Sequence, residues 1–218
     1  MTRQQVQELI ATGESQTIEF KRRFSSPEKI ARELCAFANT DGGYLLIGVD
    51  DDGKVIGVAS EKQEIELIEL ACSLYIRPPL NAEVWVVSLN GKDVVVVSIT
   101  PSPLRPHRVV VPGTEQRGTV FIRYCDQSIV ASREAVHLLS SQRPDAPPLR
   151  LRIGPHERAL FRFLEANGRI TVSQFARLVR IPPRKASQIL VRLTRAGLLQ
   201  FHLEPTAEYF TLAGEEAR

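Results

Sequence analysis

Three prolines within one short segment divide this chain into two parts. The segment Gln142-Arg143-Pro144-Asp145-Ala146-Pro147-Pro148 combines prolines with polar residues. Proline lacks an amide hydrogen and clashes with the preceding helical turn, so a helix or central strand does not continue through such a segment. With 218 residues, the chain is long enough for two domains of ordinary size. We therefore expect a domain at 1–142, a proline-rich linker at 143–150 and a second domain at 151–218.

Charge is distributed unevenly between these parts. Residues 1–150 carry 17 basic and 19 acidic side chains, whereas residues 151–218 carry 11 basic and 6 acidic ones, a net charge of +5. No acidic residue lies between Glu165 and Glu204, although seven basic residues fall there. A stretch of one sign within a periodic segment indicates a polyanionic partner.

Several classes of protein are not indicated. No segment approaches the roughly 18 consecutive apolar residues of a membrane span, and the first residues lack the apolar region of a signal peptide, so we expect a cytoplasmic protein without a membrane partner. Cys35, Cys72 and Cys125 are far apart, which does not suit a disulfide framework or a zinc site. We expect the first two cysteines to be small buried hydrophobic residues.

The first part alternates helical and strand patterns. Helical spacing of apolar residues occurs at 3–12, 27–38, 61–75 and 132–139, and strand patterns occur at 16–20, 44–49, 84–89, 93–99 and 119–124. Asn90-Gly91 predicts a type I′ hairpin turn. A second tight turn at 50–53 predicts that residues 55–58 pair back as another hairpin.

The second part is predominantly helical. Helical patterns occur at 155–167, 172–179 and 183–196, followed by two short strands at 198–202 and 209–212 with a loop that contains Pro205. The fold class is therefore α+β, with a mixed α/β domain followed by three helices and a β-hairpin.

This second part resembles a bacterial winged helix-turn-helix domain. The resemblance rests on Thr171-Val172-Ser173-Gln174-Phe175-Ala176 and on Leu190-Val191-Arg192-Leu193-Thr194-Arg195-Ala196-Gly197-Leu198-Leu199. In such domains the last helix enters the major groove with its N-terminal residues near the base edges. The residues expected to contact nucleic acid are Arg184, Lys185, Gln188, Arg192 and Arg195. The alternative is a module for protein contacts or dimerisation.

The first part is similar to the Schlafen/AlbA-like domain over about residues 9–140. The matching motifs are Gly13-Glu14-Ser15 with Glu19-Phe20-Lys21, then Ala36-Phe37-Ala38-Asn39-Thr40 and Leu45-Leu46-Ile47-Gly48-Val49-Asp50-Asp51, and later Arg77-Pro78-Pro79 and Phe121-Ile122-Arg123. The resemblance implies either a DNA-binding regulator, often fused to a helix-turn-helix domain, or a metal-dependent endoribonuclease that cleaves transfer or ribosomal RNA.

The endoribonuclease alternative assigns specific residues. The catalytic acids would be Glu14, Glu19 and either Asp50 or Asp51, which would bind Mg²⁺ or Mn²⁺, while Lys21 would stabilise charge on the phosphate. Glu14 and Glu19 can converge only if the chain bends between them. Alternatively, Glu19 pairs with a basic side chain and the aspartates form a solvated turn. The glycines 42, 43 and 48 do not have the spacing of a Walker loop for ATP.

This chain also departs from the nuclease pattern. Schlafen nuclease cores contain two such domains and a zinc site of paired Cys and His, whereas this sequence has one such domain and lacks that spacing. We expect a homodimer, because two-fold pairing is the commonest assembly and would supply the second domain. His107 lies between Pro106 and Arg108, and we expect it in a surface loop.

The sequence is therefore consistent with three functions. The first is a nucleic-acid-binding protein, specifically a DNA-binding transcription regulator for which duplex DNA is favoured and structured RNA is the alternative ligand. The second is the metal-dependent endoribonuclease, and the third is a protein-interaction module.

Overall fold

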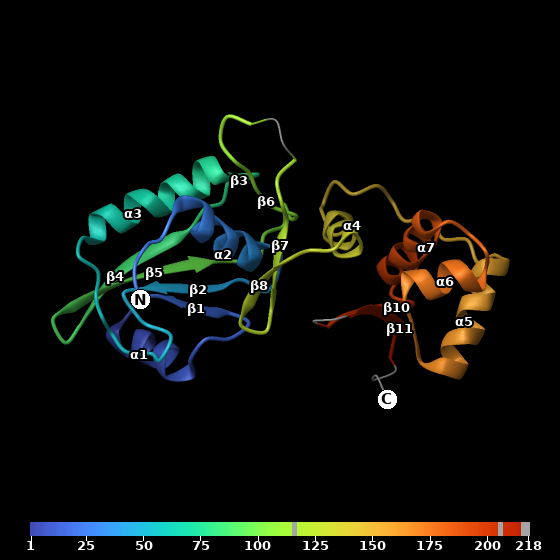
Figure 1. Cartoon of the computed structure of the whole chain (residues 1–218), viewed down its shortest axis with the longest axis horizontal. Helices are drawn as coiled ribbons and strands as arrows, with labels where there is room; N and C mark the ends of the chain where they lie inside the picture. Colours follow the sequence, from blue (N-terminus) through green and yellow to red (C-terminus); the bar gives the residue numbers. More distant parts are fainter. Residues whose placement is uncertain (115–116, 205–206, 215–218) are drawn as a thin grey trace. The chain divides into compact units, whose positions relative to one another are not determined.

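The chain forms two compact units, Met1–Ser132 and Arg133–Arg218 (Figure 1). The structure, a computed structural model, describes residues 1–114, 117–204 and 207–214. Helix α4 (Arg133–Ser141) belongs to the second unit and packs against α7 (Pro183–Arg195). The boundary between the units therefore precedes α4, whereas the sequence placed this helix in the first domain, before the proline-rich segment. Pro205, which the sequence places in a loop, lies outside the described residues.

A four-stranded sheet forms the centre of the first unit. Its strands are β1 (Ile18–Lys21), β2 (Gly43–Ile47), β5 (Lys92–Ile99) and β4 (Glu83–Leu89), in that spatial order. Strand β1 runs parallel to β2, and the other neighbouring pairs are antiparallel. Asn90 and Gly91 join β4 to β5 with φ angles of 52° and 77°, as the predicted type I′ turn requires.

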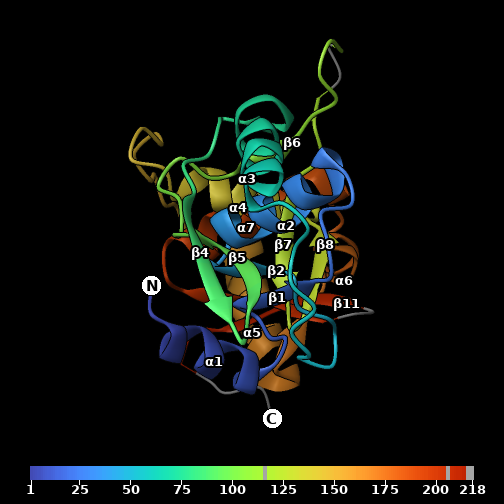
Figure 2. The same ribbon diagram turned by 90° about the vertical axis from the view of Figure 1, so that its left-hand side faces the viewer.

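Helices cover both faces of this sheet (Figure 2). Alternate residues of a strand face opposite sides, so Leu45 and Val97 pack on the side of α2 (Pro27–Asn39) and α3 (Glu61–Leu70). Leu46 and Val96 pack on the other side, where α1 (Arg3–Thr12) contributes Val6. A π-helical turn, η1 (Ala71–Tyr75), extends α3.

Local sequence signals account for the helix ends in this unit. Ser26 caps α2, because its hydroxyl accepts the Lys29 amide, and Pro27 occupies the first turn; serine and proline are favoured at these two positions. Cys35 and Cys72 are buried as expected, and burial raises the pKa of each thiol to about 12. The hairpin predicted at 55–58 is confirmed in part, because Val55 forms an antiparallel bridge with Val49 and the Ile56 amide donates to Gly48 O. The pairing ends there, since the Val58 amide donates to Asp93 O instead.

Two short ribbons complete the first unit. One pairs β3 (Ile76–Arg77) with β6 (Arg108–Val109), and the other pairs β7 (Phe121–Tyr124) with β8 (Gln127–Val130). Strand β7 packs against α2. This packing brings side chains of β7 to the edge of the central sheet near β1.

The second unit contains the three expected helices and the hairpin in the expected order. Helix α5 (Pro155–Asn167) precedes the short strand β9 (Arg169–Ile170), and α6 (Val172–Leu178) precedes α7. Strands β10 (Leu199–Glu204) and β11 (Ala207–Leu212) form the hairpin, and β9 pairs with β11. A core around Leu160, Phe175, Leu190 and Phe210 joins all these elements. In the described part of the chain, the helices are too short or too polar to cross a bilayer.

Candidate functional site

A buried arginine of β7 connects three elements of the first unit. The Arg123 side chain is fully buried and donates to Glu19 Oε2 on β1 at 2.9 Å and to Glu33 Oε2 on α2 at 3.3 Å. It also donates to the main-chain oxygens of Ser15 at 2.6 Å and Gln16 at 3.3 Å. A buried charge is tolerated only when it is paired and hydrogen-bonded, and this guanidinium meets both conditions.

Strand periodicity explains why Glu19 points inward. Phe20 packs on the α1 side of the sheet, so Glu19 faces the opposite side with its β2 partner, Leu45. Glu19 is only 7% exposed. Its Oε2 pairs with Arg123, and its Oε1 contacts Lys21 Nζ. Both carboxylate oxygens of Glu19 are therefore engaged by cations of the same chain.

Glu33 is the second carboxylate beside Arg123. Burial raises the pKa of Glu33, and the nearby negative charge of Glu19 raises this pKa further. The Ser128 hydroxyl, which donates to Glu33 Oε2, and the charges of Lys21 and Arg123 oppose that rise. Two carboxylates and two cations thus form one cluster, which we call the Arg123 cluster (Glu19, Lys21, Glu33 and Arg123).

The bend that would bring Glu14 beside Glu19 is present. The chain turns tightly after α1, where the Ser15 amide donates to Ile18 O at 2.9 Å. Glu14 Oε1 then accepts the Phe20 amide at 2.9 Å. Glu14 therefore satisfies a main-chain donor of β1.

Three of the other residues expected in a catalytic site lie within electrostatic reach of Glu14. Burial raises the pKa of Glu14, and the negative charges of Glu19 and Asp51 raise it further, while the Phe20 amide and Lys21 lower it. Glu14 thus lies within electrostatic reach of Glu19, Lys21 and Asp51, and Asp51 is far from the other three in the sequence.

These carboxylates do not fit a divalent metal ion in this arrangement. Glu19 and Glu14 already accept protein donors, and Asp50 closes its own turn because its Oδ1 accepts the Lys54 amide at 2.9 Å. Mg²⁺ requires several oxygen ligands in near-octahedral geometry. Within 1–114, 117–204 and 207–214, no group of three or more His, Cys, Asp or Glu side chains is placed to hold a metal ion.

His107 is buried rather than in a surface loop, so that expectation was wrong. The residue is 1% exposed. Its Nδ1 lies 2.7 Å from Pro78 O, its Nε2 lies 2.7 Å from Ser102 Oγ, and its amide donates to Asn39 Oδ1 at 2.7 Å. This histidine holds the loops together and is not accessible to a phosphate.

The second unit presents a basic end of α7 to solvent. Arg184, Lys185 and Gln188 are exposed, while Ala186 and Leu190 on the opposite side of the helix are buried in the core. The first turn of α7 contains no acidic residue. Three of the five residues expected to contact nucleic acid are therefore accessible on one helix.

The other two expected residues make contacts inside the second unit. Arg192 is half-buried and pairs with Glu157 of α5 at 2.9 Å, and Glu157 also accepts the Gly154 amide at 2.9 Å. Arg195 is half-buried and donates to Pro147 O. These arginines hold α5 and the proline-rich segment against α7.

A family model for the Schlafen AlbA_2 domain matches residues 14–132, which is more than half of the chain. The chain belongs to the Schlafen AlbA_2 family. The matched region ends at the last residue of the first structural unit. The family domain therefore contains the Arg123 cluster but neither α4 nor the helices of the second unit.

Two solved structures are similar to this chain. The DIP2311 protein from Corynebacterium diphtheriae is 18% identical with a TM-score of 0.48, over 67% of this chain and 34% of that one. The N-terminal domain of a putative ATP-dependent DNA helicase RecG-related protein from Nitrosomonas europaea is 26% identical with a TM-score of 0.42, over 59% of this chain and 92% of that one. This chain thus matches about a third of the length of the DIP2311 protein.

The sequence did not single out every important residue of the Schlafen AlbA_2 domain. In the sequence, Arg123 and Asn39 stand out only as parts of the matching motifs, and Glu33 belongs to none of these motifs. Asn39 is buried, and its Nδ2 donates to the main-chain oxygens of His107 at 3.0 Å and Phe121 at 2.8 Å. One sequence signal could have identified such residues, namely a polar residue at a position that faces the core. Arg123 is an example, because it lies on the same face of β7 as Phe121.

Proposed function

We propose that this Schlafen AlbA_2 protein binds nucleic acid through the N-terminal half of α7 and acts as a DNA-binding transcription regulator. The observation that carries the proposal is the exposed pair Arg184 and Lys185 at the start of that helix. A helix N-terminus carries partial positive charge, so each cation placed there costs about 0.3–1 kcal/mol. An anionic partner at this position would reverse that cost.

The arrangement of the second unit supports a winged helix-turn-helix. Helices α6 and α7 follow one another through a short turn, and the β10–β11 hairpin follows α7. In this class of domain the second helix of the motif enters the major groove. Helix α7 is the corresponding element, and its exposed side carries the basic residues.

The exposed polar residues of α7 have a chemistry suited to a duplex. Arg184 and Lys185 can donate to phosphate oxygens or to the guanine edge, and Gln188 can pair with adenine. Arg192 and Arg195 are engaged by Glu157 and Pro147, so we assign them to positioning α7. Duplex DNA is the ligand we propose, and structured RNA is the alternative ligand.

The proposal is tested with the full chain and matched charge-removal variants. Arg184→Ala/Lys185→Ala removes two exposed charges from α7, and Arg158→Ala/Arg162→Ala removes two exposed charges from α5. We expect the α7 variant to lose most binding to labelled duplex DNA, while the α5 variant retains it. Equal binding by both variants, or no binding by the wild type at low salt, would overturn the proposal.

We further propose that the protein acts as a homodimer, since a two-fold pair would present two α7 helices to successive turns of a duplex. Sedimentation equilibrium at micromolar concentration should give the mass of a dimer. A monomer mass throughout that range would refute this part.

The endoribonuclease that the family resemblance implies has one supporting observation, which is that Glu19, Lys21 and Asp51 lie within electrostatic reach of Glu14. Against it, Glu14 and Glu19 already bind groups of the protein. Labelled transfer RNA with Mn²⁺ or EDTA separates the two functions, and we expect intact RNA in both conditions. Mn²⁺-dependent cleavage that is lost in Glu14→Ala would establish the nuclease instead.

A further inference from the structure

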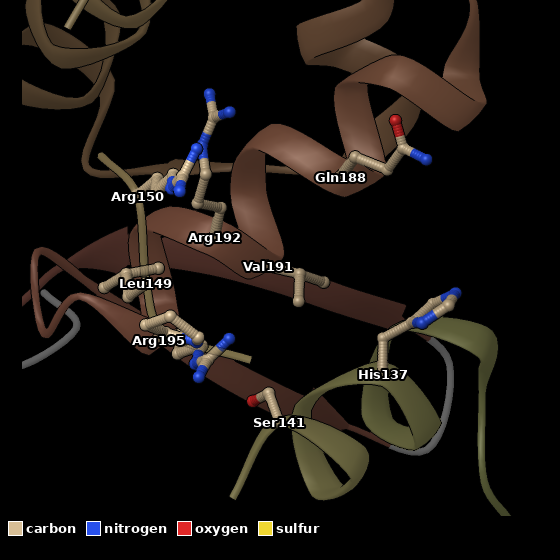
Figure 3. Close-up of a pocket in the computed structure, with 9 residues that line it drawn as sticks. His137, Ser141, Leu149, Arg150, Gln188, Val191, Arg192 and Arg195 are labelled. Carbon is tan, nitrogen blue, oxygen red and sulfur yellow. The ribbon is translucent and has the colours of Figure 1, made fainter. Parts of the chain in front are cut away.

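A cavity of about 280 Å³ lies within the second unit, on the side of α7 that faces α4. Figure 3 shows Gln188 and Val191 on α7 facing His137 and Ser141 on α4. This volume is just below the roughly 300–1,000 Å³ found for small-molecule pockets. A compact organic molecule, rather than a peptide or a dinucleotide, matches this volume.

The lining of the cavity combines apolar side chains with positive charge. Pro148 and Leu149 of the proline-rich segment, together with Val191, supply most of the apolar wall. Arg150 and Arg195 lie at the same end as Leu149 (Figure 3). None of the nine described residues that line the cavity is acidic.

Arg192, which also lines the cavity, has a hydrogen-bond donor without a partner among the described residues. It lines the cavity, and its Nη2 pairs with Glu157. Its Nε is buried and has no hydrogen-bond partner among the described residues. Buried donors are normally paired, and this unpaired Nε belongs to a residue that lines the cavity.

We propose that this cavity binds a small organic anion with an apolar body and one carboxylate or phosphate group. The apolar body lies against Leu149 and Val191, and the anionic group lies beside Arg150 and Arg192, whose side chains are neighbours in Figure 3. Guanidinium groups bind carboxylates and phosphates through paired hydrogen bonds. The site is independent of the Arg123 cluster, which belongs to the other unit.

One consequence rests on the proposed function. Gln188 belongs both to this cavity and to the exposed side of α7. A bound anion would therefore compete with duplex DNA for the same surface of α7. The binding test below uses no nucleic acid, so its failure is separate from a failure of the proposed function.

The test uses three probes that share one ring system. Calorimetric titration of the full chain compares 2-naphthoate, 2-naphthyl phosphate and the uncharged 2-naphthamide. We expect saturable binding of at least one anion and binding of the amide that is weaker by about tenfold or more, because a charge-assisted hydrogen bond is lost. Which anion binds more tightly assigns the site to carboxylates or to phosphate monoesters.

Variants locate the binding. Val191→Trp fills the cavity and should abolish binding while the circular dichroism spectrum stays unchanged. Arg150→Ala, at an exposed residue that lines the cavity, should weaken binding, whereas Arg152→Ala, which removes the same charge at an exposed residue outside it, should not. The proposal is overturned if neither anion binds at millimolar concentration, if the amide binds equally well, or if Arg150→Ala and Arg152→Ala have the same effect.

Discussion

Replacing Glu19 with glutamine separates a structural role of the Arg123 cluster from a catalytic one. Glu19→Gln keeps the shape of the side chain and removes its charge. Arg123 then loses one of its two carboxylate partners, although Glu33 at 3.3 Å and two main-chain oxygens stay in place. Removing one partner of a buried ion pair costs about 3–5 kcal/mol.

We expect Glu19→Gln to lower the free energy of unfolding by an amount near or below the lower end of that range. Glu33 still neutralises Arg123, and the glutamine oxygen can still accept a hydrogen bond, so we estimate a decrease of about 2–3 kcal/mol in the free energy of unfolding. For a domain of this size that corresponds to a fall of roughly 6–12 °C in melting temperature.

The assay is urea unfolding followed by tryptophan fluorescence. Trp85 on β4 is the single tryptophan of the chain, so its signal reports the first unit and not the second. The exposed Glu69→Gln on α3 is the matched control and should change stability by less than about 0.5 kcal/mol. Unchanged or increased stability of Glu19→Gln would refute the structural role, because catalytic carboxylates are often kept at a cost in stability.

Three further predictions concern the same structure. Because the pKa of Glu33 is raised in the folded state, the folded protein binds this proton more tightly than the unfolded chain does. The contribution of Glu33 to stability therefore falls as the pH rises above the unfolded pKa of 4.5. Glu33→Gln should flatten this fall in the free energy of unfolding, and an unchanged slope would contradict the raised pKa of Glu33. Gly42 and Gly91 both have φ +77°, but a Cβ on Gly42 would lie 2.6 Å from Ile99 O, whereas a Cβ on Gly91 would have nothing within 4 Å. Gly42→Ala should therefore lower the free energy of unfolding by about 2 kcal/mol more than Gly91→Ala. Equal losses would disprove the clash at Gly42. Thr171 caps α6, so Thr171→Ala should lower stability of the second unit by about 1 kcal/mol, measured by helical circular dichroism, and no change there would show that the cap is dispensable.

The elements predicted from the sequence are those with local causes. Ser26-Pro27 begins α2, Asn90-Gly91 joins two strands, and Thr171 caps α6, since each signal needs only its neighbours in the chain. The fold class and the order of three helices and a hairpin follow from the same kind of pattern.

The errors concern residues whose positions depend on distant partners. The hairpin predicted at 55–58 stops after the bridge of Val55 with Val49, because the Val58 amide donates to Asp93 O of another strand. Strand β8 was missed because its pairing with β7 is the main evidence for it. The alternation of apolar and polar residues does not reveal such contacts.

In the candidate site, too, the features with local causes were predicted and those that depend on distant partners were not. The proximity of Glu14 and Glu19 was expected on condition of a bend, and the hydrogen bond of Glu14 to the Phe20 amide is consistent with that bend. The buried state of His107 and the central position of Arg123 depend on partners that are far away in the sequence, such as Asn39 for the first and Glu19 for the second. Sequence spacing gives no measure of that proximity.

The salt dependence of duplex binding tests the central claim most directly. Each phosphate contact contributes about −0.9 to the slope of log affinity against log salt concentration. If Arg184 and Lys185 each contact a phosphate, Arg184→Ala/Lys185→Ala should reduce the steepness of the slope by about 1.8, while Arg158→Ala/Arg162→Ala leaves it unchanged. An identical slope for the wild type and the α7 variant would show that α7 does not contact the nucleic-acid backbone.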